Sequence, residues 1–154
     1  MESKSFELVK NAIEVSIIER GRKHVSTILM GFAAAYWFRD ALLEVANLSN
    51  DQNLFLSFRE GDKVFVVQKQ RNGRVNFVIV MVLGDSKGRG CVIIPEGRDA
   101  WGWRGVSHEI NGLLISKVIE KKSVNHRWPI AGNFTVQGHQ ISNSRKESRT
   151  LKIS

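Results

Sequence analysis

The feature that most constrains the fold is a β-rich stretch from Lys63 to Leu114 that ends in a helical pattern. Two apolar runs, Lys63–Gln70 and Val75–Leu83, flank the short segment 71–74, which reads Arg-Asn-Gly-Arg. Asn-Gly between two apolar runs is a strong hairpin signal, because a type I′ turn needs positive φ at both of its central residues. The stretch therefore predicts two antiparallel strands joined by a tight turn.

A third strand and a helix are expected after this hairpin. The Gly-rich segment 84–90 leads into the β-branched run Cys91–Ile94. Four apolar residues then fall at i, i+4, i+7 and i+8, the spacing of one helical face: Val106, Ile110, Leu113 and Leu114. Within the hairpin, both faces of Val75–Leu83 are apolar apart from Asn76, which predicts a central strand covered on both sides.

The first third of the chain shows the same order of elements. Short strands are expected over Phe6–Val9, Ala12–Glu19 and His24–Met30, and a helix from Phe32 or Ala33 to about Leu48. A shift of 66 residues aligns three pairs: Ile28 with Ile94, Gly31 with Gly97, and Trp37 with Trp103. Three identities in a chain this rich in Gly and Ile are also compatible with chance. The prediction of an internal duplication therefore rests on the shared order of elements.

The net charge of +8 is concentrated near the C-terminus. Residues 1–120 hold 16 Lys and Arg against 14 Asp and Glu, whereas residues 121–154 hold seven Lys and Arg against one Glu. Helical periodicity fades after Lys117, and the last residues read as disordered. We therefore expect a first repeat over 1–50, a second repeat over 51–120, and a basic, largely disordered tail over 121–154. Such a tail either attracts phosphates without regard to sequence or only aids solubility.

Several classes of protein are disfavoured by what the sequence lacks. No apolar run approaches the roughly 18 residues of a membrane helix, and the N-terminal residues show no signal or transit pattern. The single Cys91 excludes an intrachain disulfide and favours a reducing, intracellular compartment, nuclear or cytoplasmic. The four His residues are scattered without metal-ligand spacing. We therefore expect no membrane association, no catalytic residue, no metal and no cofactor, and predict that the protein is not an enzyme.

Several stretches resemble the PUR family of single-stranded nucleic-acid-binding proteins. Phe32–Val45, which contains Phe-Arg-Asp and follows a basic Gly-Arg-Lys turn and a strand, resembles the end of a PUR repeat. Lys69–Arg74, with Phe77 beyond it, resembles the basic Gly-containing hairpin of the family. Residues 91–103, CVIIPEGRDAWGW, resemble the last strand and the start of the helix, and are also similar to diverged plant relatives with an IPEGR-x-x-x-GW arrangement.

The resemblance implies a fold and a function, and covers about residues 5–120. The implied fold is α+β, with two β-β-β-(β)-α repeats forming one intertwined PUR-like or Whirly-like domain of antiparallel curved sheets and two packed helices. The implied function is binding of single-stranded DNA or RNA with low sequence specificity, in transcription or RNA regulation. Homodimerisation through helices or sheet edges stays open. The alternative is a protein-interaction domain that keeps this fold but has lost nucleic-acid binding.

The candidate contacts with nucleic acid are basic, amide and aromatic residues of the second hairpin and of the turns in both halves. They are Lys63, Lys69, Arg71, Asn72, Arg74, Phe77, Arg20, Arg22, Lys23, Lys87 and Arg89. Aromatic rings stack on bases, and Lys and Arg follow the phosphates. On the strand that begins at Lys63, one face combines Lys63, Lys69 and Arg71 with Phe65 and Val67, which suits a binding face. The simpler alternatives are an edge strand protected by lysine, core packing for Phe77, and solvated charge in the turns.

Overall fold

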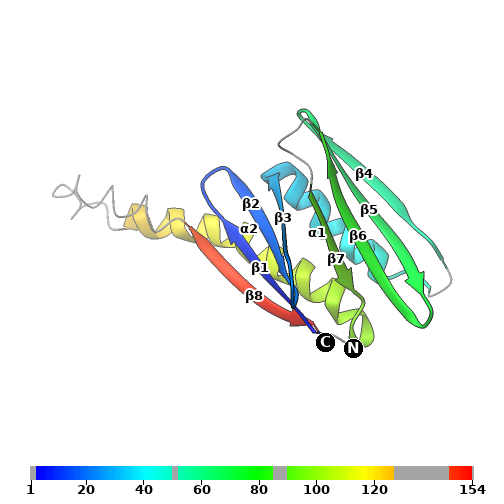
Figure 1. Cartoon of the computed structure of the whole chain (residues 1–154). Helices are drawn as coiled ribbons and strands as arrows, with labels where there is room; N and C mark the ends of the chain where they lie inside the picture. Colours follow the sequence, from blue (N-terminus) through cyan, green and yellow to red (C-terminus); the bar gives the residue numbers. More distant parts are fainter. Residues whose placement is uncertain (1–2, 50–51, 85–89, 127–145, 154) are drawn as a thin grey trace.

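The computed structural model describes residues 3–49, 52–84, 90–126 and 146–153, with side chains in the last helix described up to residue 116. It contains two four-stranded antiparallel sheets with two helices packed behind them (Figure 1). The elements are β1 (Lys4–Lys10), β2 (Glu14–Arg20), β3 (Val25–Gly31), α1 (Phe32–Ala46), β4 (Phe55–Glu60), β5 (Lys63–Asn72), β6 (Val75–Leu83), β7 (Gly90–Pro95), the 3-10 turn η1 (Arg98–Ala100), α2 (Trp101–His126) and β8 (Glu147–Ile153). The expected α+β class with two packed helices is confirmed.

The C-terminal strand completes the first sheet. The strand orders are β3-β2-β1-β8 and β4-β5-β6-β7. Along the chain, α1 follows β1–β3 and α2 follows β4–β7, and β8 comes last. β8 pairs with β1 along its whole length, from Lys4 opposite Ile153 to Lys10 opposite Glu147. The prediction of disorder is therefore wrong for Glu147–Ile153, and α2 extends to His126. The rest of the predicted tail, residues 127–145, lies outside the described part of the chain.

The two hairpins differ from their predicted turns. In the second hairpin Asn72 pairs with Val75, so the turn is Gly73-Arg74, and Gly73 has φ +64°. Glycine at the first of two turn residues is typical of a type II′ turn rather than the predicted type I′. In the first hairpin the Asn11 Oδ1 atom accepts the N–H groups of Ile13 and Glu14, both at 2.9 Å, so the second strand begins at Glu14 rather than Ala12.

Each helix reaches across to the sheet of the other half. α1 follows β3 yet packs on β4 and β5, and α2 follows β7 yet packs on β1 and β8. The helices also contact each other and the last strands of their own sheets. Both helices lie behind the sheets in Figure 1, so the inner faces of the two sheets share one core. Neither half could bury its own inner face without the other.

The shared core is built from apolar side chains of all these elements. Its largest fully buried members are Trp103, Phe6, Phe38, Phe65, Leu8, Ile17, Ile28, Met30, Leu42, Ile94, Ile110 and Leu113. Ile28 and Ile94, which the shift of 66 residues aligns, both occupy buried inner positions, on β3 and β7. The Trp103 indole N–H donates to the Ile94 carbonyl at 2.9 Å, and Trp37 stacks on Phe58 with ring centroids 5.5 Å apart.

A buried carboxylate joins the two sheets where β3 and β7 meet. Glu19 on β2 is only 2% exposed; its Oε1 atom accepts the Ile93 N–H at 2.9 Å, and its Oε2 atom pairs with the Lys4 ammonium at 2.7 Å. Lys4 also donates to the Ile93 carbonyl at 3.3 Å. At Ile93 the outward backbone groups of the edge strand β7 are thus satisfied by side chains from the other sheet. A Cβ on Gly90 would lie 2.7 Å from the Thr27 carbonyl.

A second carboxylate, Glu60, joins the second sheet to the start of α1. Glu60 ends β4, and its two oxygens accept the N–H groups of Gly31 at 2.8 Å and Ala34 at 2.9 Å. The first N–H groups of a helix lack partners within the helix, and the residue before α1, Gly31, offers no side chain to cap them. A Cβ on Gly31 would lie 2.7 Å from a Glu60 oxygen, so glycine permits this approach.

We predict that Glu60→Ala lowers the free energy of unfolding by about 1–2 kcal/mol, because the N-terminus of α1 loses its acceptor. Urea denaturation followed by circular dichroism measures this change. Glu44→Ala, on the exposed side of α1, is the matched control and is expected to change stability by less than about 0.5 kcal/mol. Equal effects of the two substitutions would contradict the capping role.

β8 is fitted closely against α2 as well as β1. A Cβ on Gly105 would lie 3.1 Å from Leu151, and one on Gly112 would lie 2.5 Å from the Arg149 guanidinium. Arg149 pairs with Glu109 at 3.3 Å, and Ser116 donates to Glu147 at 2.6 Å. The glycines of α2 therefore make room for a strand that the first sheet needs.

We predict that Ile153→Ala costs about 2–4 kcal/mol of stability, because the side chain is buried in the shared core. Thr150→Ala, on the exposed face of the same strand, should cost less than about 0.5 kcal/mol. Thermal or urea unfolding of the full chain measures both. If Ile153→Ala were as harmless as the control, β8 would not belong to the folded domain.

Candidate nucleic-acid interface

The face of β5 that was predicted to bind is the inner face of its sheet. Phe65 and Val67 are fully buried, and Lys69 is 3% exposed, with its ammonium donating to the Ser49 carbonyl at 2.8 Å. The prediction that this face is open is therefore wrong. Its sequence signal was ambiguous, because both faces of β5 and β6 carry apolar residues and periodicity alone does not say which is covered.

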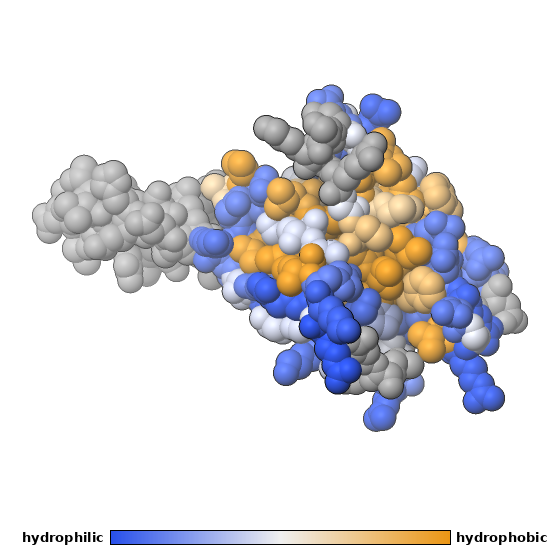
Figure 2. Space-filling model, in the orientation of Figure 1, coloured by the Kyte–Doolittle hydropathy of each residue, from blue (hydrophilic) through white to orange (hydrophobic). Residues whose placement is uncertain are grey.

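The opposite face of the second sheet, here called the outer face, is the one left accessible. Its residues line up in cross-strand rows: Phe55–Gln68–Ile79–Ile93, Ser57–Val66–Met81–Cys91, and Gln70–Phe77–Pro95. Figure 2 shows broad hydrophobic areas on the side of the molecule turned away from the helices. β6 is a central strand as predicted. The predicted cover on both faces is wrong for the described residues, which bury the inner face of β6 and leave its outer face partly exposed. Phe55 is 61% exposed, and Phe77 is half-buried.

An aromatic ring and a guanidinium share a cavity at the hairpin end of this sheet. The cavity has a volume of about 580 Å³, and it is lined by Asn53, Leu54, Phe55, Gln68, Lys69, Gln70 and Arg71. Arg71 donates through Nε to the Gly73 carbonyl at 3.0 Å, which holds it at the turn. Asn72 and Arg74 belong to the same exposed turn. Phe77 lies one row from Phe55, opposite Gln70.

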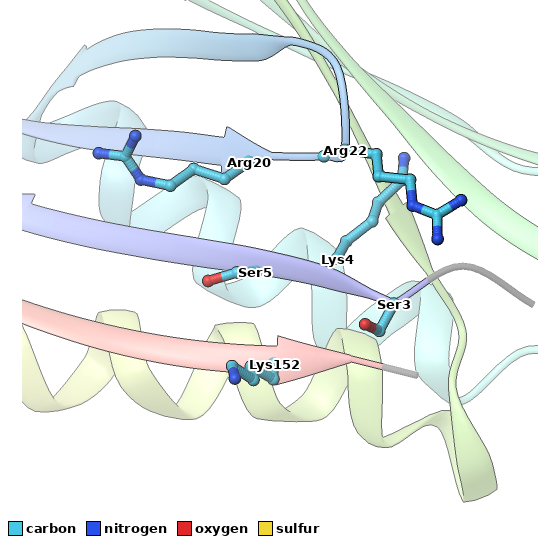
Figure 3. A pocket seen from close by; sticks show the side chains of 7 residues that line it. Ser3, Lys4, Ser5, Arg20, Arg22 and Lys152 are labelled. Carbon is cyan, nitrogen blue, oxygen red and sulfur yellow. The ribbon is translucent and has the colours of Figure 1, made fainter.

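The remaining predicted residues fall elsewhere. Lys63 stands at the other end of β5, opposite Glu60, roughly 27 Å along the strand from Arg71. Arg20 and Arg22 line a cavity of about 630 Å³ at the end of the first sheet, together with Ser3, Lys4, Ser5, Gly21 and Lys152 (Figure 3). Lys23 is exposed in the same turn. Lys87 and Arg89 lie outside the described residues.

Most residues that line these cavities, Phe55 and Lys152 among them, escaped sequence reasoning. Phe55 was not singled out because an isolated aromatic in a short strand gives no sign of which face it occupies. Alternation on β5 gave no clear hint, because polar residues occur on both of its faces: Gln68 and Gln70 on one, Lys69 and Arg71 on the other. Lys152 was assigned to a disordered tail, and only strand pairing brings it near Arg20.

No group of three His, Cys, Asp or Glu side chains in the described residues could hold a metal ion. Within the same residues, no helix has the length and apolar character needed to cross a membrane. Trp103 is buried in the core and Trp37 packs against it, whereas Trp101, at the start of α2, is 57% exposed.

No protein-family model matches this chain, and neither the curated proteins nor the solved structures include a match. The functional argument therefore rests on the residues and their geometry.

Cys91 lies on the outer face of the second sheet, opposite Met81. Partial burial, and then the charge of Glu19, raise the pKa of the Cys91 thiol, while Lys4 acts in the opposite direction. Only the thiolate reacts readily with alkylating reagents, so a raised pKa makes this thiol slow to react at neutral pH.

We predict that alkylation of Cys91 by iodoacetamide reaches half its maximal rate at a higher pH in the folded chain than in the chain unfolded by urea. Burial and Glu19 raise the pKa only while the protein is folded. The pH dependence of the rate, followed by mass spectrometry, gives both midpoints. A folded midpoint at or below the unfolded one would show that Lys4 outweighs burial.

Proposed function

We propose that the chain binds single-stranded DNA or RNA on the outer face of its second sheet. The observation that carries this proposal is the exposed Phe55 ring, which shares a cavity with Arg71 and lies one row from Phe77. Proteins that bind single strands without sequence preference combine aromatic platforms for bases with cations for phosphates. The outer face offers the aromatic rings, and Arg71 and Arg74 in and beside the exposed turn offer cations at its hairpin end.

Each group on this face has a defined role in the proposal. Phe55 and Phe77 stack on or pack against bases, and they stand on strands two places apart, roughly 10 Å across the sheet. Gln68 and Gln70 lie between them and offer amide donors and acceptors to base edges. Arg71 and Arg74 at the turn contact phosphates. Because few cations are involved, affinity should depend on stacking and fall only modestly with salt.

A protein-interaction function is favoured by a different feature of the same face. The outer-face rows that run from β4 to β7 are mainly apolar. Among the described residues paired in these outer-face rows, Arg59 is the only charged one. Apolar areas of this kind mark protein contacts as well as nucleic-acid platforms. Oligonucleotide binding decides between the two functions.

We predict that Phe55→Ala and Phe77→Ala each weaken binding of a labelled single strand by about 5- to 150-fold, the loss of about 1–3 kcal/mol of stacking. Fluorescence anisotropy measures the affinity, with a duplex of the same sequence as the comparison ligand. Tyr36→Ala is the matched control, because Tyr36 is an exposed aromatic on α1, in the layer behind the sheets.

The full chain is the right material for this experiment. A chain cut at residue 120 would lack β8 and expose the inner face beside β1. Undetectable binding by the unaltered chain, or equal losses for the Tyr36 and phenylalanine variants, would contradict the proposed interface. Binding of the duplex without binding of the single strand would also contradict the proposed interface.

A further inference from the structure

Three residues on the outer face of the first sheet stand in one cross-strand row. Ser5 on β1 pairs with Arg20 on β2 and with Lys152 on β8. Directly opposed residues of antiparallel strands point to the same side of the sheet. The backbones of Arg20 and Lys152 are therefore roughly 10 Å apart, with the Ser5 hydroxyl between them.

The turn between β2 and β3 adds a further cation to this row. The Gly21 N–H donates to the His24 carbonyl at 3.0 Å, and the closed turn carries Arg22 to the rim of the 630 Å³ cavity. In Figure 3 the Arg20 and Arg22 side chains extend in opposite directions, Ser5 and Ser3 lie on the neighbouring strand below them, and Lys152 lies on the next strand. Lys4 also lines the cavity, but its ammonium is paired with Glu19.

The lining of this cavity has an excess of positive charge. None of its seven residues is acidic. Besides Glu19, which neutralises Lys4, the carboxylate paired with a lining residue is Glu7, which contacts Arg20 at 3.1 Å; the Arg20 side chain is 52% exposed and that of Glu7 30%. An exposed ion pair contributes little to stability, so Arg20 turns toward another anion at small cost. The site thus has three cations and two hydroxyl donors against one weakly held carboxylate.

We propose that this cavity binds a phosphate group. Arg20 and Arg22 present planar guanidinium groups suited to two phosphate oxygens at once, and Lys152 and the Ser5 hydroxyl supply further donors. The site is complete only when β8 is paired with β1, because Lys152 arrives on that strand. Binding of phosphate therefore requires the closed first sheet.

The phosphate belongs to the backbone of the bound single strand, and this part of the inference rests on the proposed function. The row ends at Val25 on β3. β3 contacts β7 of the second sheet, and there Lys4 and Glu19 form hydrogen bonds with the backbone of Ile93. Ile93 in turn belongs to the row that contains Phe55. A strand crossing both sheets would meet cations first and aromatic rings at its other end.

The test uses inorganic phosphate as the probe and the amide chemical shifts of the full chain as the readout, with sodium chloride at matched ionic strength. The site variant is Arg22→Gln with Lys152→Gln. The matched control is Lys23→Gln with Lys146→Gln, which removes the same charge from exposed positions outside the cavity. We expect saturable shifts at Ser5, Arg20 and Lys152, and a phosphate affinity at least about tenfold weaker in the site variant than in the control.

A second arm measures the affinity of each variant for a labelled single strand. A larger loss in the site variant than in the control supports a backbone phosphate as the ligand. Phosphate binding without oligonucleotide binding would sink the proposed function and the backbone assignment but keep the phosphate site. Absent phosphate shifts, or equal phosphate affinity in both variants, would overturn the phosphate site even if oligonucleotides bind to the second sheet.

Discussion

The structure depends on one constraint: each sheet buries its inner face only with help from the other half. α1 crosses to β4 and β5, α2 crosses to β1 and β8, and two carboxylates fix the exchange. Glu60 reaches from the second sheet to the N-terminus of α1, and Glu19 reaches from the first sheet to the edge of β7. Because both helices pack against the inner faces, they leave the outer faces of the two sheets uncovered.

The C-terminal strand links this architecture to function. By closing the first sheet, β8 shields the inner side of β1 and places Lys152 in the same row as Ser5 and Arg20. The basic excess of the last 34 residues is therefore in part a structured feature. The protein presents cations on the first sheet and apolar and aromatic groups on the second, on faces that β3 and β7 join.

Local signals in the sequence were enough to predict most elements, because hairpins, helix periodicity and repeated order depend on neighbours in the chain. Contacts between residues far apart in the chain, such as the pairing of β8 with β1, could not be predicted from these local signals. β8 has charged residues, Glu147 and Arg149, at inward positions, which hides its alternation, and its partner β1 lies at the other end of the chain. Lys69 looked accessible because nothing local shows that the Ser49 carbonyl receives its ammonium. The proposed class of ligand came from the net charge and from the resemblance to the PUR family, whereas the face proposed to bind it could be assigned only from the strand register.

The most direct test is chemical-shift mapping of the full chain with a short unlabelled oligothymidine at moderate salt. The account predicts that shifts cluster on β4, β5 and β6 around Phe55, Gln68 and Phe77, and leave the outward face of α1 around Tyr36 unchanged. Shifts confined to the helices, or none at concentrations where the chain stays folded, would contradict binding on the outer face of the second sheet.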